Sequence, residues 1–190
     1  MREEDNQFLS DYEDTLMQTL LRQITDTGLL EGELLTVEEL DEMWNKSAAE
    51  YMAAAMPQLN DYPAAAVAWA AYMGMGLAVV WDTAWSEHEG KEELFTLLAS
   101  PRGFDQMDEY VIEELLGYSL DSPDAVKIEE MLRSAASTAL TMIRKESIEA
   151  QSVMAFYIFA RTTRVMYKLG VAVSLRLLGY RYHKTQMGVC

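Results

Sequence analysis

The residues best suited to chemistry in this chain are few and widely spaced. It has two histidines, His88 and His183, and one cysteine, Cys190, which is its last residue. A multi-histidine zinc or iron centre needs more ligands than these, and an internal disulfide needs a second cysteine. No serine stands in a nucleophile-elbow pattern, and no glycine-rich loop follows a predicted strand. The sequence therefore predicts no catalytic residue, no metal centre and no cofactor.

One acidic group nevertheless has a spacing that suits a metal. Glu38, Glu39 and Glu42 form a Glu-Glu-x-x-Glu group, which places acids on one side of a helix and offers hard oxygen ligands to Mg²⁺. The group resembles the first half of the motif of all-α nucleoside triphosphate pyrophosphatases of the MazG type. That resemblance implies a Mg²⁺-dependent nucleotide pyrophosphatase bundle, but the family's second half, a Glu-x-x-Asp on the next helix, is absent between residues 50 and 82. The alternative is a solvated first turn that the helix dipole stabilises.

An aromatic group near the end of the most apolar segment is a candidate ligand site. Tyr72, Trp81 and Trp85 lie on one predicted helix, with Asp82 and His88 beside them. Such a group would line a cleft where an apolar core opens to solvent. Packing within the core is the alternative for the aromatic residues, and a solvated helix end is the alternative for His88.

A cationic stripe is the second candidate. Arg161, Arg164 and Lys168 are spaced three and four residues apart, on one face of an otherwise apolar helix. The stripe could hold an anionic ligand. Ion pairing to the chain's own acids is the alternative that we favour.

Nearly every segment has the apolar spacing of a helix, and none alternates as a strand does. We expect helices over about 6–27, 37–56, 63–87, 91–99, 105–118, 123–145 and 148–178. Thr36 with Glu39 predicts a capping box, Ser122 predicts a cap, and Gly170 marks a bend. The fold class is therefore all-α: one domain over 1–190, a bundle of about six to seven helices.

The segment 63–87 is expected to be the buried central helix of this bundle. It is rich in Ala and Gly, and Ala66, Ala70, Gly74 and Ala78 form a ridge of small residues that lets a neighbouring helix approach closely. Residues 63–81 contain no charge over a length that could cross a bilayer. Because the segment is alanine-rich and has acidic flanks, we predict a core helix and no membrane span.

The charge is distributed unevenly along the chain. The 190 residues carry a formal charge of −16, but all 31 acids and only nine Lys or Arg residues precede residue 150, which gives that part −22. The remaining 41 residues carry +6. An acidic chain repels phosphate backbones, which argues against a nucleic-acid partner. No basic start and apolar run mark a secretion signal, so we expect a cytoplasmic protein.

Three functions remain open at this point. The first is a non-enzymatic, cytoplasmic, acidic helical protein that binds a basic protein partner, as an immunity, antitoxin-like or regulatory protein would. The second is a small-molecule-binding protein or enzyme with an apolar pocket between helices near Trp81, Trp85 and Arg161. The third is the pyrophosphatase-like bundle. A homo-oligomer through the apolar C-terminal helix is a further expectation.

Overall fold

The computed structural model describes residues 2–88 and 93–181, and that part of the chain is helical with no strand, as expected. The α-helices are α1 (Glu3–Asp26), α2 (Glu38–Ala55), α3 (Pro63–His88), α4 (Leu94–Ala99), α5 (Met107–Tyr110), α6 (Pro123–Lys145) and α7 (Val153–Leu177). Two 3₁₀ turns, η1 (Met56–Leu59) and η2 (Phe104–Gln106), and a π-helical turn, η3 (Val111–Leu115), complete the described elements.

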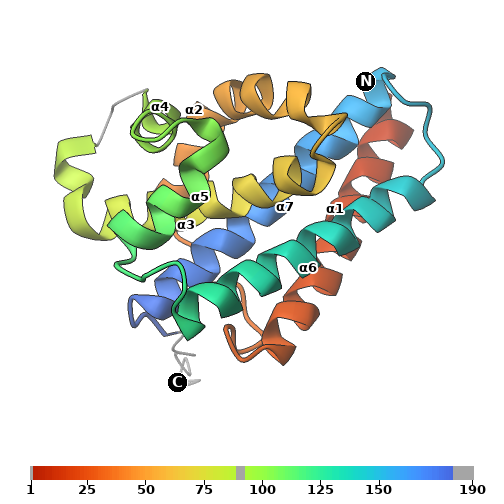
Figure 1. Ribbon diagram of the computed structural model, residues 1–190. Helices are drawn as coiled ribbons and strands as arrows, with labels where there is room; N and C mark the ends of the chain where they lie inside the picture. The colour runs from red at the N-terminus through yellow and green to blue at the C-terminus, as the bar shows by residue number, and fades with distance from the viewer. Residues whose placement is uncertain (1, 89–92, 182–190) are drawn as a thin grey trace, which may run out of the picture.

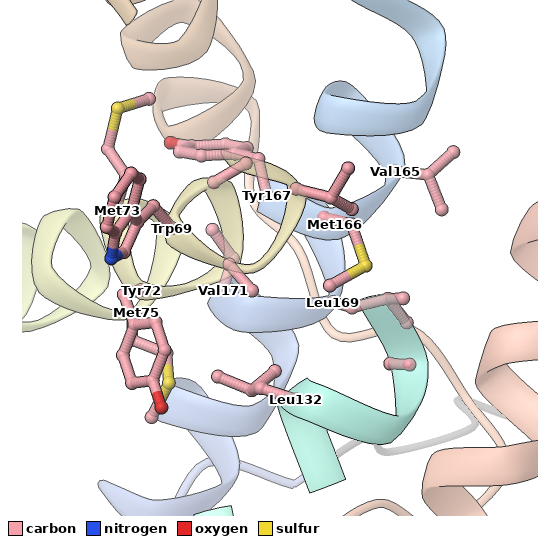
Figure 2. Close-up of a cluster of buried hydrophobic side chains, with 14 of the residues drawn as sticks. Trp69, Tyr72, Met73, Met75, Leu132, Val165, Met166, Tyr167, Leu169 and Val171 are labelled. Carbon is pink, nitrogen blue, oxygen red and sulfur yellow. The ribbon is translucent and has the colours of Figure 1, made fainter. Parts of the chain in front are cut away.

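Two long helices cross at the centre of the bundle. Figure 1 shows α3 and α7 crossing in the middle, with α1 and α6 along one side and α2, α4 and α5 along the other. Every residue from Ala66 to Val80 on α3 is buried except the half-buried Ala68. Large side chains from both helices, among them Met73 and Tyr167, fill the core around the crossing (Figure 2). The predicted central helix is confirmed.

The crossing depends on two glycines, one on each helix. A Cβ atom built on Gly74 would lie 2.2 Å from the carbonyl oxygen of Tyr167, and one built on Gly170 would lie 1.9 Å from that of Ala71. Both distances are shorter than any real contact, and both involve backbone atoms that cannot rotate away. The predicted bend at Gly170 is wrong, because α7 continues through this residue as a regular helix. Glycine is needed at this position because it has no side chain, which lets the backbone of α3 approach closely.

The amphipathic outer helices bury the predicted stripes. The buried residues of α1 are Leu9, Tyr12, Leu16, Leu20 and Ile24. On α6 they include Ile128, Leu132 and Ala135. Ser122 caps α6 as expected, since its Oγ accepts the backbone N–H of Ala125 at 3.2 Å. One core joins residues from all seven described α-helices.

Several predicted boundaries are wrong, each for a local reason. The capping box at Thr36 does not form, because α2 starts at Glu38 and Val37 occupies the N-cap position. The last helix starts at Val153 rather than residue 148, because Ser147 and Gln151 have positive φ and Ser152 Oγ caps the helix.

The expected helix over 105–118 is not one α-helix. It is a 3₁₀ turn, a single α turn and a π turn in succession. The wide π turn lets the adjacent Val111 and Ile112 both face the core. The start of the helix expected over 91–99 lies outside the described residues.

α3 also passes a length-and-composition test for a membrane span. Among the described helices it is the one that does so, over Pro63–Ala84 with a mean hydropathy of 1.6. In this fold 83% of that window is buried by the other helices. Such burial is what a core helix requires.

α7 is covered mostly by its own chain. It contacts α1, α2, α3 and α6, and most of its residues from Ile158 to Leu175 are buried. Large apolar side chains are exposed at its first turns, at Val153, Phe156 and Tyr157. A homo-oligomer through this helix stays a prediction, and it would have to use that end.

Adding one methyl group at the crossing should destabilise the protein. Alanine is better than glycine inside a helix by about 1 kcal/mol, so a loss on Gly→Ala substitution reports a steric clash. We expect Gly74→Ala and Gly170→Ala each to lower the free energy of unfolding by about 1–3 kcal/mol in urea denaturation. Gly76→Ala is the control, since the atoms nearest to its Cβ would be side-chain atoms of Leu98 and Val111 rather than backbone atoms. Equal losses for all three would contradict the crossing.

Candidate functional site

A pocket of about 440 Å³ lies between the start of α3, α5 and α6. Its apolar wall comes from alanines 64, 65 and 68 and from Trp69, whose ring lies 4.8 Å from the ring of Phe104. Polar groups from three separate parts of the chain complete the lining: Asp61, Tyr62, Tyr72, Asp108, Glu129 and Arg133. Few polar groups on an apolar wall are typical of ligand sites.

Tyr72 is the residue that distinguishes this pocket from ordinary surface. The residue is only 4% exposed, and its hydroxyl makes no hydrogen bond with another described residue. The hydroxyls of the other three buried tyrosines described do have one: Tyr12 with Thr162 Oγ1 at 2.7 Å, Tyr51 with the carbonyl of Ala66 at 2.6 Å and Tyr167 with that of Leu40 at 2.7 Å. The oxygen of Tyr72 is not among the buried atoms of the described residues that lack a partner, so the hydroxyl is accessible from the pocket that it lines.

The position of Tyr72 explains how its hydroxyl reaches the pocket. Figure 2 places its ring at the margin of the core cluster, with the oxygen at the end turned away from Tyr167. Burial raises the pKa of Tyr72, and the nearby carboxylates of Asp108 and Glu129 raise it further. The hydroxyl therefore stays protonated and neutral, and its oxygen can accept a hydrogen bond from a ligand.

Asp108 is the second perturbed group of the site. Loss of hydration on burial raises the pKa of its carboxyl above the ordinary value of 3.8, against the lowering effect of hydrogen bonds from the backbone N–H groups of Glu109 and Asp108 itself. The negative charges of Glu109 and Glu129 raise it as well. A cation placed beside such a desolvated carboxyl would stabilise its charged form.

The pocket has an excess of negative charge. Glu129 pairs with Arg133 one helical turn away on α6, so these two charges offset each other. Asp61 and Asp108 have no ion pair with another described residue. With Trp69 and Tyr62 in the lining, the site combines two free carboxylates with aromatic rings, an arrangement that suits an organic cation.

The same lining offers little for catalysis. It contains no serine, cysteine, histidine or lysine that could act as a nucleophile. Asp108 could donate a proton, but no second group with the opposite perturbation lies in the lining to act as its base. Binding is the chemistry that this set of residues supports.

The structure does not bring the sequence-predicted aromatic group to one place. Tyr72 and Trp81 are nine residues apart on α3, which separates them by about 14 Å along the axis and turns them to opposite faces. Trp81 is half-buried with its ring 5.8 Å from that of Tyr180, whose hydroxyl donates to Asp82 at 2.6 Å. These contacts hold the segment after α7 against α3.

The remaining members of that group are His88 and Trp85. His88 is the half-buried last residue of α3, beyond a kink at Ala84. The side chain of Trp85 lies outside what the structure describes, as do His183, Lys184 and Cys190. Among the predicted site residues whose side chains are described, Tyr72 alone lines the pocket.

The predicted cationic stripe pairs with the chain's own acids. Arg161 contacts Glu13 of α1 at 2.5 Å, and Arg164 lies 3.7 Å from the same carboxylate. Lys168 lies 3.8 Å from Asp41 of α2. Arg161 also lies 16 residues before the end of α7, which is about 24 Å along the helix axis. Trp81 contacts Tyr180 beyond that end, so Arg161 and Trp81 do not share a site. The alternative favoured from the sequence is the arrangement that forms.

The acidic group at the start of α2 does not make a metal site. Glu38, Glu39 and Glu42 are exposed in the first turns of the helix. The described residues include no group of three or more His, Cys, Asp or Glu side chains placed to hold a metal ion. The residues present thus do not fit the Mg²⁺ that the pyrophosphatase resemblance implies.

Comparisons with known proteins add no family to this picture. No protein-family model, no curated protein and no solved structure matches the chain.

Sequence reasoning missed most of the pocket for a physical reason. Asp108 stands among Asp105, Glu109 and Glu113, and in the sequence all four are equivalent first-turn acids. Only packing against α3 desolvates Asp108. The one available signal was Tyr72, a tyrosine within a segment otherwise made of small and apolar residues.

The Glu13 ion pairs should contribute measurably to stability. Glu13 is only 14% exposed, whereas Glu31, which pairs with Arg176, is 65% exposed. We expect Glu13→Gln to lower the free energy of unfolding by about 1–3 kcal/mol, because it leaves Arg161 without its charged acceptor. Glu31→Gln should cost less than about 1 kcal/mol. Urea denaturation of both variants at one salt concentration measures the difference, and equal losses would contradict it.

Replacing Asp108 should stabilise the protein at neutral pH. Because the pKa of Asp108 is raised on folding, the folded state holds this proton more tightly than the unfolded state. Its contribution to the free energy of unfolding therefore falls as pH rises through the ordinary value of 3.8 and beyond. We expect Asp108→Asn to raise the melting temperature at pH 7, with the gain shrinking toward pH 3.

Asp105→Asn is the matched control for that measurement. Asp105 lies three residues earlier and is exposed, so the same change in charge meets water rather than the pocket. A gain of equal size for both variants would mean that net charge, and not desolvation of Asp108, is responsible.

Proposed function

We propose that this protein is a non-enzymatic, cytoplasmic binding protein that captures a basic protein partner, and that the pocket between α3, α5 and α6 receives a lysine or arginine side chain of that partner. The observation that carries the proposal is the desolvated, unpaired carboxyl of Asp108, which lines the pocket together with Tyr72, whose hydroxyl has no partner among the described residues. Arg133, the one cation in the described lining, is paired with Glu129.

The charge of the whole chain supports capture of such a partner. A formal charge of −16 creates a negative field that attracts a cationic protein and speeds association. The four bases of α7 do not neutralise the pocket, because they pair elsewhere, with Glu13, Glu31 and Asp41. Long-range attraction and a specific acidic recess then act together.

The lining supports recognition of a side chain rather than of charge alone. A lysine stem is apolar and would contact Ala65, Ala68 and Trp69 while its ammonium group meets Asp61 and Asp108. Aromatic rings favour a cation on their faces. Tyr72 is too buried to serve as a general surface contact, so a ligand must enter the pocket to reach it.

Binding in this site should depend on pH. A cation beside Asp108 favours the charged carboxylate, whose pKa is raised in the free protein. Binding therefore releases protons in the acidic range, and affinity should fall as pH decreases through the raised pKa.

A tetra-lysine peptide is a direct probe of the proposal. By isothermal titration calorimetry at pH 7 and low salt, we expect Asp108→Asn to weaken binding about fivefold or more and Tyr72→Phe to weaken it about threefold to tenfold. Asp105→Asn, the matched change outside the pocket, should leave affinity within about twofold.

Two results would contradict the proposal. If Asp105→Asn and Asp108→Asn weaken the peptide by the same factor, the peptide senses only the overall charge and the pocket is not its site. Binding that 1 M salt leaves unchanged would also contradict an electrostatic mode.

A further inference from the structure

A second cavity, of about 610 Å³, lies at the opposite end of α6. It is formed by η1, the last turns of α6, the connection after it and the first turns of α7. Most of its lining is apolar, including Met56, Leu59, Leu140, Ile143, Phe156 and Phe159. Met56 and Phe156 are about 40% exposed, so this apolar surface is open to a ligand.

The charge at this cavity is the reverse of that in the acidic pocket. Arg144 is the only charged residue in its described lining, and no carboxylate is among the others. Arg144 is exposed and makes no ion pair with another described residue. No described carboxylate in the lining therefore opposes the positive charge of Arg144.

The first turn of α7 adds to the same field. This 25-residue helix begins at Val153 with no acid in its first turn, and Ser152 and Ala155 both line the cavity. The positive end of a helix dipole favours a negative group near it. Arg144 and the start of α7 thus offer one anionic charge a place at the edge of an apolar recess.

We propose that this cavity binds an amphipathic carboxylate of the fatty-acid class. Its hydrocarbon chain would cover Leu140, Ile143 and Phe159, and its carboxylate would lie toward Arg144. The volume falls within the range of small-molecule sites, and the apolar lining exceeds what a small polar anion needs. This site is separate from the acidic pocket and stands or falls independently of the partner proposed for it.

Dodecanoate, decanoate and octanoate are the probes, each used below its micelle-forming concentration. Isothermal titration calorimetry on the full chain should give one saturable site for dodecanoate. Affinity should rise about fourfold for each methylene that is buried, so the three acids should bind in order of chain length.

Two neighbouring bases provide matched variants for the head group. Arg144→Gln should weaken dodecanoate about fivefold and leave dodecanol unchanged. Lys145→Gln removes the same charge from the same helix end, but Lys145 does not line this cavity. It should leave both ligands within about twofold.

Three results would overturn the proposal. The first is the absence of saturable dodecanoate binding. The second is equal weakening by Arg144→Gln and Lys145→Gln, which means general attraction of an anion. The third is tighter binding of dodecyltrimethylammonium than of dodecanoate, which means that the cavity prefers the opposite charge. Because Arg144 is exposed, loss of folding is not expected, and a melting curve of each variant checks this.

Discussion

The rest of the fold depends on backbone contact between α3 and α7. At Gly74 and Gly170 the two helices approach so closely that each glycine faces a backbone carbonyl of the other helix. This contact sets the angle and the register of the two longest apolar elements. The amphipathic helices then have only one face left to cover, which explains why α1, α2 and α6 each bury a single stripe.

The same crossing determines how the charges are used. Because α7 is held at the centre, its bases emerge beside α1 and α2, where Glu13 and Asp41 meet them. The four bases of α7 are thereby paired with acids of the same chain. The two cavities lie outside this paired region, one bounded by unpaired acids and the other by an unpaired arginine. Their opposite charges are a consequence of that division.

Much of the architecture could be predicted from the sequence, because it follows from local patterns. The stripe from Leu9 to Ile24 and the cap at Ser122 each depend on neighbouring residues alone. The errors occur where distant segments decide the local structure. The π turn at Val111 packs against the core. Position 170 requires glycine because the backbone of Ala71, about one hundred residues earlier, lies against it.

The candidate sites divide in the same way. By itself the sequence determined the all-helical class, the apolar central helix, the separation of acids from the basic last segment and the small number of histidines. Only the tertiary structure decided that Asp108 is desolvated, that the hydroxyl of Tyr72 has no partner among the described residues and that Arg161 pairs with Glu13. The reason is that desolvation and hydrogen bonding depend on which groups meet in space. Tyr72, Asp108 and Arg133 come from three segments whose spacing along the chain carries no record of their meeting.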